Sequence, residues 1–493
     1  MQDKVINPSK ITIVGAGTAG LVSALILKTR FPSYDIKIIC SKKIGTIGVG
    51  EGSTEHWHEF TSFVGINLAD LIKATDATFK IGVVFKGWGV PDYMHSIQDG
   101  YNETAGEYPY VFGSLIGNGA MSQDLSGEVF WKNKLHSRYL KENNSPVTQY
   151  HFNTFKLIDF LTGIASERGI EIIDDEIKDV VLNEQGEIAH LSSEHSTYTS
   201  DFFIDSTGFK KLLISKLGAK WKSHSEYLKT NSAIVFQTQD SENYNMWSMA
   251  QGMKYGWMFR TPTFGRWGNG YIYDSEFLTP EQAQQEVEEF LGIPIKIGQH
   301  LKFDPGAVDR AWIKNCCAIG LSSSFIEPLE ASSIGTTIQQ TFMLMHKLVN
   351  YNDAVVDNYN RSFRDIIENI RDFVLLHFIT PRRDTEFWRK VADVELPNSL
   401  TNMLKSWEHK LPVQEDFSHL SRYILFKQFH FILVLHGLKL FNVESIQKEF
   451  ESLPLEVKNH AKYLISDIRN YYKDSESADI ITHKQALEFI RES

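Results

Sequence analysis

Apolar residues follow two different periods along this chain, and each period predicts a different kind of element. Residues 11–14 form a continuous run of β-favouring residues, and residues 35–40 form a second one. Between them, apolar positions at helical spacing begin at Leu21 and continue to about Thr29. A helix-period segment between two short apolar runs is typical of a strand–helix–strand unit with parallel strands. The first forty residues therefore predict the start of an α/β domain.

Two later patterns bear on single elements. Residues 79–85 alternate between apolar and other positions, which predicts one strand with Lys80 on the face opposite Phe79 and its apolar neighbours. A lysine on such a strand is usually solvated. Residues 151–168 have the period of an amphipathic helix, and strand-like runs joined by Gly or polar turns follow them.

On a larger scale, the pattern divides the chain into two parts. Residues 221–300 are rich in β-favouring runs, whereas the pattern from Ser333 onward is helical nearly to the end. We therefore expect a body of residues 1–337, with the β-rich segment inserted at about 221–300. A helical subdomain of residues 338–493 would complete the chain.

The turn between the first strand and the first helix contains glycines spaced G-x-G-x-x-G. In such a turn Gly15 allows the tight bend, Gly17 lets a pyrophosphate approach the backbone, and Gly20 lets the helix pack closely on the strand. The free N–H groups of the helix N-terminus favour the phosphates. A dinucleotide site is predicted, with an ordinary glycine-rich turn as the alternative. The residues that would form it are Gly15, Ala16, Gly17, Thr18, Ala19 and Gly20.

Two further segments narrow the choice of dinucleotide. Cys40 and Ser41 stand where many such folds carry the acid that binds the adenosine ribose, which weakens a nicotinamide reading and leaves FAD open. After Asp205 the chain continues Ser-Thr207-Gly208, and a similar small–Thr–Gly turn closes over the dinucleotide in glutathione-reductase-like FAD folds.

Composition excludes several classes of function. The net charge of -11 argues against nucleic acid or an anionic membrane as the main partner. The three cysteines give no disulfide framework, and the 17 histidines show no H-E-x-x-H motif, so no metal site is predicted. The N-terminus lacks the regions of a signal peptide, and the apolar stretch 428–437 is shorter than the ~20 residues that span a bilayer. We expect a cytoplasmic protein.

Five markers in order give the chain a family resemblance. They are Gly15-x-Gly17-x-x-Gly20, Gly48-x-Gly50-Glu51, Lys80 in its strand, Phe325-Ile-Glu-Pro-Leu-Glu330, and His377-Phe-x-x-x-Arg-Arg-Asp-Thr-Glu-Phe-Trp388. The chain resembles the flavin-dependent halogenases of the tryptophan-halogenase family over roughly residues 11 to 390. The last two markers are the more specific ones.

The resemblance implies a fold and a reaction. The fold would be α/β, an FAD-binding glutathione-reductase-like Rossmann-type domain with a β-rich substrate face and a C-terminal helical subdomain that covers the substrate site. FADH2, O2 and a halide ion would generate a hypohalous species that halogenates a small aromatic substrate. A separate NADH-dependent flavin reductase would supply FADH2, since no second dinucleotide motif is visible. A homo-oligomer is possible.

The resemblance also implies site residues. Lys80 matches the catalytic lysine that binds, or is halogenated by, the hypohalous species, and Glu330 matches the glutamate that works beside it. A cation there can polarise the oxygen–halogen bond, and a carboxylate can stabilise the cation formed on the arene. The backbone amides of Ser332 and Ser333 would bind the halide. The remaining implied cofactor contacts are Gly48, Gly50, Glu51, Ile177, Thr207, Gly208, Leu321 and Ile334.

Two departures from the family pattern leave alternatives open. The family's Trp-x-Trp-x-Ile-Pro motif is Trp257-Met-Phe-Arg-Thr-Pro262 here, and Ala331 replaces the serine that usually follows the key glutamate. The aromatic clamp for free tryptophan cannot be aligned, so an indole or phenol substrate is expected. A flavin monooxygenase that hydroxylates without halide, or a flavin-binding protein without catalysis, remain alternatives.

Overall fold

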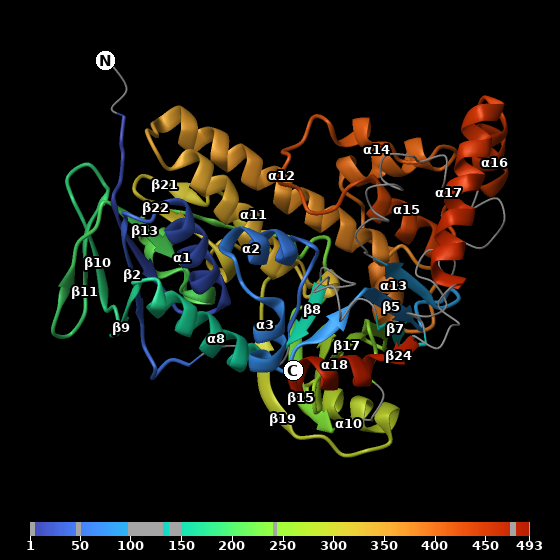
Figure 1. Cartoon of the computed structure of the whole chain (residues 1–493), viewed down its shortest axis with the longest axis horizontal. Helices are drawn as coiled ribbons and strands as arrows, with labels where there is room; N and C mark the ends of the chain where they lie inside the picture. The colour runs from blue at the N-terminus through green and yellow to red at the C-terminus, as the bar shows by residue number, and fades with distance from the viewer. Residues whose placement is uncertain are drawn as a thin grey trace.

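The computed structural model describes residues 5–45, 51–96, 132–137, 149–239, 244–473 and 480–492. Element labels follow Figure 1. The helices are α1 (Thr18–Arg30), α2 (His56–Val64), α3 (Leu68–Thr75), α8 (Thr154–Glu167), α9 (Leu212–Lys216), α10 (Pro280–Leu291), α11 (Ser332–Lys347), α12 (Asp353–His377), α13 (Glu386–Ala392), α14 (Asn398–Trp407), α15 (Gln428–Gly437), α16 (Val443–Glu451), α17 (Leu455–Lys473) and α18 (His483–Glu492). No helix in these parts of the chain is long and apolar enough to cross a membrane.

The strands form two large sheets and several small ones. They are β1 (Lys10–Val14), β2 (Asp35–Cys40), β3 (Glu51–Gly52), β4 (Thr78–Lys80), β5 (Gly82–Lys86), β6 (Tyr93–Ser96), β7 (Lys134–His136), β8 (Gln149–Phe152), β9 (Glu171–Asp174), β10 (Asp179–Leu182), β11 (Ile188–Ser192), β12 (Thr197–Tyr198), β13 (Phe202–Asp205), β14 (Trp221–Ser223), β15 (Ser232–Gln239), β16 (Ser248–Gly252), β17 (Gly256–Thr263), β18 (Arg266–Tyr273), β19 (Ile297–Lys302), β20 (Gly306–Val308), β21 (Trp312–Ile313), β22 (Cys316–Ala318), β23 (Ser324–Phe325) and β24 (Ile480–Thr482).

The first large sheet grows from the strand–helix–strand unit at the N-terminus. Its strand order is β21-β22-β13-β1-β2-β9, and the pairs from β22 to β9 are parallel. The predicted strands at 11–14 and 35–40 are β1 and β2, and the helix between them ends at Arg30. Helix α1 packs against α8 and α11, and its residues from Gly20 to Leu27 are all buried. The predicted Rossmann-type α/β class is confirmed.

The second large sheet contains the β-rich insert. Its order is β19-β15-β18-β17-β16-β5-β6, so two strands from before the insert complete it. Helix α10 covers one face, where Val287 packs with Ile234 and Met258 in a core of its own. This helix is well specified locally, because Thr279 and Gln282 form a capping box and Gly292 ends it in a left-handed conformation.

Lys80 lies in a small sheet between the two large ones, with the order β3-β8-β4. The single strand predicted at 79–85 is wrong, because the chain leaves this sheet at Ile81 and joins the second large sheet at Gly82. A side chain at Gly82 would put its Cβ 2.2 Å from the carbonyl oxygen of His95, so only glycine allows this change of sheet. The helix predicted from residue 151 starts at Thr154, since residues 151 and 152 belong to β8.

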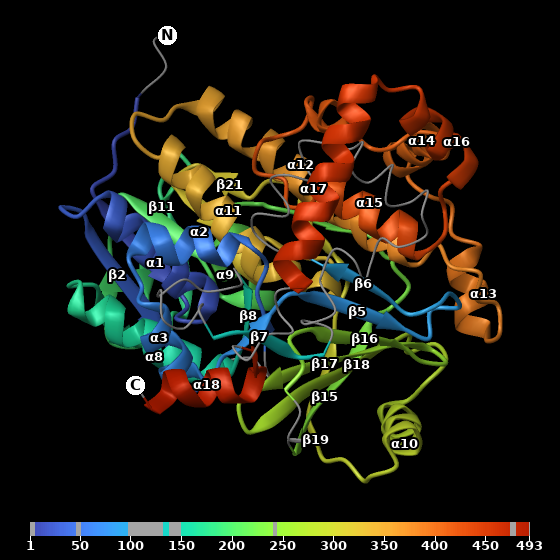
Figure 2. The same ribbon diagram turned by 45° about the vertical axis from the view of Figure 1, so that its right-hand side comes forward.

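The C-terminal part is mostly helical, with α12 and the group α14 to α17 gathered on one side of the molecule (Figures 1 and 2). Helix α18 lies apart from that group, against α3 and β24, and β24 pairs with β7. Helix α11 continues through residues 337 and 338. The division of the chain at that point stays a prediction.

Candidate active site

Three turns meet at the carboxyl edge of the first sheet. The turn after β1 is tied to β2 by Gly15 N–H, which donates to Ile39 O (2.8 Å). The turn after β13 is tied to β1 by Ser206 N–H, which donates to Val14 O (2.9 Å), and Ile319 N–H after β22 donates to Asp205 O (3.0 Å). Ligands of such folds bind outside the carboxyl ends of parallel strands. Predicted cofactor residues from all three turns are therefore brought together.

The glycines of the first turn have the geometry that a dinucleotide phosphate requires. Gly15 has φ +112°, and a Cβ at Gly20 would lie 2.0 Å from the Gly15 carbonyl oxygen. Around Gly17, in contrast, an added Cβ meets nothing within 4 Å, so the space over the N-terminus of α1 is open. The buried Ser206 hydroxyl has no partner among the described residues. An open backbone cradle beside an unpaired hydroxyl fits a phosphate group.

The other predicted cofactor residues differ in how they are placed and in whether their side chains are already hydrogen-bonded. The Thr207 hydroxyl is already used, because it donates to Asp205 Oδ1 (2.7 Å) and accepts from Leu212 N–H (2.9 Å). Ile177 is buried in the loop after β9, and Leu321 follows β22. The predicted contacts Gly48 and Gly50, and the side chain of Glu51, lie outside the described residues.

Lys80 is the fully buried last residue of β4, contrary to the usual solvation of a strand lysine. Its Nζ donates to the carbonyl oxygen of Ser53 at 2.6 Å. Burial lowers the pKa of Lys80 to about 8, although the carboxylates of Glu330 and Glu55 act in the opposite direction. The side chain is thus poised to hold or release a proton near neutral pH.

Glu330 projects from a turn with strained backbone. Glu330 and Ala331 both have left-handed conformations, with φ 65° and 53°, immediately before α11 begins. The Glu330 carboxylate accepts from His95 Nδ1 (2.8 Å) and His377 Nε2 (3.1 Å). Although burial alone would raise the pKa of this carboxyl, the two histidines hold it well below its usual range.

The structure brings Lys80 and Glu330 to one site. A Cβ added at Gly52 would lie 3.6 Å from Lys80 Nζ and 3.4 Å from the Cβ of Ala331, the residue after Glu330. Gly52 therefore occupies the narrow space between the two predicted catalytic segments. The site consists of a buried ammonium group near a buried, ionised carboxylate.

A small cavity lies next to Glu330, at the N-terminus of α11. Its volume of about 10 Å³ is room for one small ion or one water molecule. The lining residues are Gly320, Ser324, Phe325, Ile326, Ser332, Ser333, Thr336 and Ile370. Both predicted halide-binding residues are among them, and free N–H groups at a helix N-terminus favour an anion. Neither Leu321 nor Ile334 lines this cavity.

The altered tryptophan motif on β17 contacts both predicted catalytic segments. Trp257 Nε1 donates to the buried carboxyl of Glu327, three residues before Glu330. Burial raises the pKa of Glu327 to about 7. Pro262 O accepts from the Thr78 hydroxyl (2.7 Å), two residues before Lys80. The packing function of the motif is therefore present in this chain.

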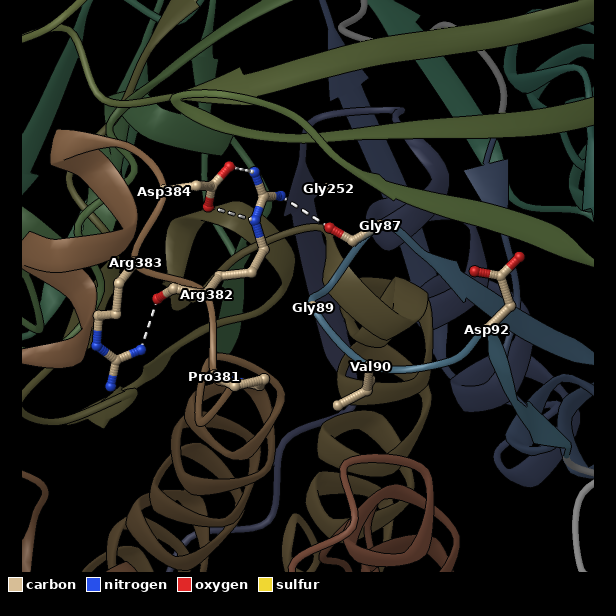
Figure 3. Close-up of a pocket in the computed structure, with 9 residues that line it drawn as sticks. All are labelled: Gly87, Gly89, Val90, Asp92, Gly252, Pro381, Arg382, Arg383 and Asp384. Atoms are coloured by element: carbon tan, nitrogen blue, oxygen red, sulfur yellow. Dashed lines mark hydrogen bonds and ion pairs between the residues drawn. The ribbon is translucent and has the colours of Figure 1, made fainter.

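Most of the His377–Trp388 motif has a structural function. Arg382, Arg383 and Asp384 line a surface pocket of about 700 Å³ together with residues of the β5–β6 turn. Figure 3 shows how these residues lie. Arg382 is fully engaged there, because it pairs with Asp384 and donates to Gly87 O (2.8 Å) (Figure 3). Trp388 Nε1 donates to Met253 O (2.8 Å), which fastens α13 to the second large sheet.

Sequence reasoning missed the groups that surround Lys80 and Glu330. His95 on β6 and the residues Ser53 and Glu55, which share the loop between β3 and α2, form no recognisable spacing, because the two segments are far apart in the sequence. Their roles arise only from packing. The one available signal was His377, which stands at the start of a recognised motif without an assigned role.

Comparisons with known proteins identify the family of the chain. The family described as tryptophan halogenase matches residues 10–448. The 7-chloro-L-tryptophan 6-halogenase of Kutzneria sp. is 31% identical over 451 residues, which cover 82% of this chain and 86% of that protein. The tryptophan 7-halogenase of Lentzea aerocolonigenes is 28% identical over 450 residues, with 83% of each chain covered.

Solved structures show the same relationship in three dimensions. The tryptophan halogenase from Shewanella frigidimarina has a TM-score of 0.89 at 25% identity, over 99% of this chain and 98% of that one. A flavin-dependent halogenase from Xanthomonas campestris has a TM-score of 0.85 at 27% identity, with the same coverage of both chains. The chain therefore belongs to the tryptophan halogenase family and is a flavin-dependent halogenase.

Proposed function

We propose that this enzyme halogenates a small electron-rich aromatic compound, of the indole or phenol type, between Lys80 and Glu330. The observation that carries the proposal is the pair itself: a buried ammonium group whose pKa lies at about 8, next to a carboxylate held ionised by two histidines. Bound FADH2 would supply, with O2, the oxidising power that converts a halide ion to a hypohalous species. The residues of the chain then direct that species.

Lys80 and Glu330 have complementary tasks in this proposal. The Lys80 ammonium is held by Ser53 O and can polarise the oxygen–halogen bond, so that the halogen becomes electrophilic. Glu330 stabilises the positive charge that develops on the arene and can accept the proton that the ring loses. Water is excluded, since both side chains are buried, and electrostatic effects are stronger in such surroundings.

The flavin and the halide would be held on the same side of Glu330. The open turn at Gly17 and the unpaired Ser206 hydroxyl fit the pyrophosphate of FAD. The small cavity at Ser332 and Ser333 fits a halide ion. Because Ser332 follows Glu330 by two residues, a halide there would lie close to the catalytic glutamate.

Burial of the α15 aromatic side chains supports a substrate other than free tryptophan. The names of the relatives give tryptophan or chlorotryptophan as the substrate of those proteins. The aromatic residues at helical spacing that could form a tryptophan clamp in this chain are Tyr423, Phe426, Phe429, His430 and Phe431, and all of them except the partly buried Tyr423 are buried in the helical core. We therefore infer a substrate recognised by its electron-rich ring. A separate flavin reductase is the inferred source of FADH2.

The test is an aerobic incubation with FAD, a flavin reductase, NADH and a panel of indoles and phenols. Chloride, bromide and iodide are supplied separately, and products are identified by mass spectrometry. We expect a halogen mass shift with at least one arene, and its loss in Lys80→Met. Oxygen insertion without halogen would contradict the proposal and favour a monooxygenase.

A further inference from the structure

The contacts of Glu330 continue beyond its two histidine partners. His95 uses Nδ1 for Glu330, and its other ring nitrogen, Nε2, lies 3.0 Å from Nδ1 of His430 on α15. The second nitrogen of His430 lies 3.5 Å from Oε1 of Glu55, next to the start of α2. A continuous chain of four side chains therefore joins Glu330 to a second carboxylate.

The ends of this chain have different surroundings. Glu330, His95 and His430 are buried, whereas the Glu55 side chain is 22% exposed. His56 and His430 hold the pKa of Glu55 at about 2, although burial alone would raise it. Both terminal carboxylates are therefore ionised at neutral pH.

Counting protons shows that the pair of histidines between the two carboxylates carries a positive charge. Each of the three contacts joins two atoms that both have lone pairs, so each needs one proton between them. Two neutral imidazole rings carry only two ring protons. A proton in each of the three contacts, including the 3.5 Å contact of His430 with Glu55, requires one more proton than two neutral rings carry, and with both carboxylates ionised that proton lies on the histidine pair.

That additional proton belongs on the ring nearer Glu330. The His95–Glu330 contact of 2.8 Å is much shorter than the His430–Glu55 contact of 3.5 Å, which places the proton on His95. Burial also lowers the pKa of His430 to about 4, although Glu55 acts against this effect. His95 then donates through both nitrogens, to Glu330 and to His430. Its contact with Glu330, at 2.8 Å, has the length typical of a charge-assisted hydrogen bond.

The second histidine on Glu330 provides a natural comparison. Nδ1 of His377 lies 2.8 Å from the carbonyl oxygen of Phe373, so the far side of this ring ends on a neutral group. Its contact with Glu330 is longer, at 3.1 Å. Only the His95 branch continues to a second carboxylate that can compensate a charged ring.

We propose that His95, His430 and Glu55 are positioning residues for Glu330, and that a cation on His95, supported through His430 by Glu55, keeps Glu330 ionised and fixed near Lys80. The catalytic consequence rests on the proposed function, whereas the proton arrangement is independent of it. Other titratable groups that face the chain from neighbouring elements are Lys80 on β4, Tyr93 on β6, His56 on α2, His151 on β8 and His377 on α12.

The first test reads the proton arrangement directly, without flavin or substrate. The ring nitrogens of histidine are labelled with ¹⁵N, and resonances are assigned with His95→Gln and His430→Gln. At pH 7 we expect both nitrogens of His95 to be protonated and His430 to be neutral, with its proton on Nε2. A neutral His95 at this pH would overturn the proposal.

The second test measures kcat and KM for the arene in the wild type and three variants. His430→Leu breaks the chain without touching Glu330, and we expect kcat to fall about tenfold or more with KM nearly unchanged. His430→Gln can accept from His95 and donate to Glu55, so most of kcat is expected to return. His436→Leu, on the same helix but outside the chain, is the matched control.

The outcomes separate the two proposals. A folded His430→Leu enzyme with wild-type kcat, or one in which only KM changes, would show that the chain does not act through Glu330. If the wild type halogenates no arene, the proposed function fails, and the labelled histidines still decide whether His95 is charged.

Discussion

Lys80 carries a charge that its surroundings disfavour. Its pKa falls from 10.5 to about 8, which corresponds to roughly 3 kcal/mol lost on folding when the side chain is charged in both states. Lys80→Met keeps the length of the side chain and removes the charge. We expect the variant to be more stable than the wild type at pH 7, as measured by urea unfolding.

The pH dependence has a definite sign. Between about pH 8 and 10.5 the unfolded wild type binds a proton that the folded protein has released, so wild-type stability rises there and the advantage of Lys80→Met shrinks. Lys37→Met, at a partly exposed lysine on β2, is the control for the replacement of a lysine by methionine. Equal or lower stability of Lys80→Met below pH 8 would contradict the argument.

Ala331 is held in a conformation that costs free energy. A left-handed conformation costs a residue with a Cβ about 1 kcal/mol more than it costs glycine. We therefore expect Ala331→Gly to raise the free energy of unfolding by up to about 1 kcal/mol. Ala24→Gly, in the middle of α1, is the opposite control and should destabilise the protein. A less stable Ala331→Gly would mean that the Ala331 methyl group packs favourably.

At single positions, the success of sequence reasoning depended on how local the signal is. Lys80 and Glu330 could be predicted as site residues because each is part of a recognised segment. Glu55, His95 and His430 are more than thirty residues apart in sequence, and they meet because α15 packs against β6 and Glu55, just before α2, lies beside His430. A lone histidine in an apolar stretch, such as His430, looks the same whether it serves the core or the site.

At the scale of elements, substitutions in the β1–α1 turn can affect cofactor binding and folding separately. Gly17→Ala adds a methyl group in open space, so we expect unchanged thermal stability without flavin. The methyl group would occupy the path of the pyrophosphate, so the Kd for FAD should rise about tenfold or more. Flavin fluorescence titration measures it.

Gly20→Ala is the matched comparison, because its Cβ would lie 2.0 Å from the Gly15 carbonyl oxygen. This variant is expected to lose stability even without flavin. If Gly17→Ala bound FAD as tightly as the wild type, the cofactor could not approach the backbone at this turn.

Elements whose apolar residues keep one period from end to end were predicted closely, whereas the point at which a strand changes its neighbouring strand was not predicted. Strand β2 has the predicted bounds, since its apolar run begins and ends with the strand. The alternation from 79 to 85 continues smoothly although the chain changes sheets at Ile81. Periodicity records which face is buried and contains no information about which strand is the neighbour.

At the scale of the whole molecule, helix α18 supports the strand that carries Lys80. His483, at the start of α18, accepts a hydrogen bond from the backbone N–H of Phe79 (3.0 Å), and its ring stacks on Phe79. Its other nitrogen lies 3.0 Å from Tyr244 O, which makes Nδ1 the donor and Nε2 the acceptor. The region matched by the family ends at residue 448, so this support comes from beyond it.

His483→Ala would leave the buried N–H of Phe79 without this acceptor, and we expect a loss of about 2 kcal/mol in the free energy of unfolding. Because Phe79 precedes Lys80 in β4, kcat for halogenation should fall even where the variant is fully folded. His483→Gln can supply an acceptor and should recover part of both losses. Phe489→Ala, at an exposed position of the same helix, is the control for changes in α18. Wild-type kcat in folded His483→Ala would show that β4 holds Lys80 in place without α18, and that the end of the chain contributes to stability alone.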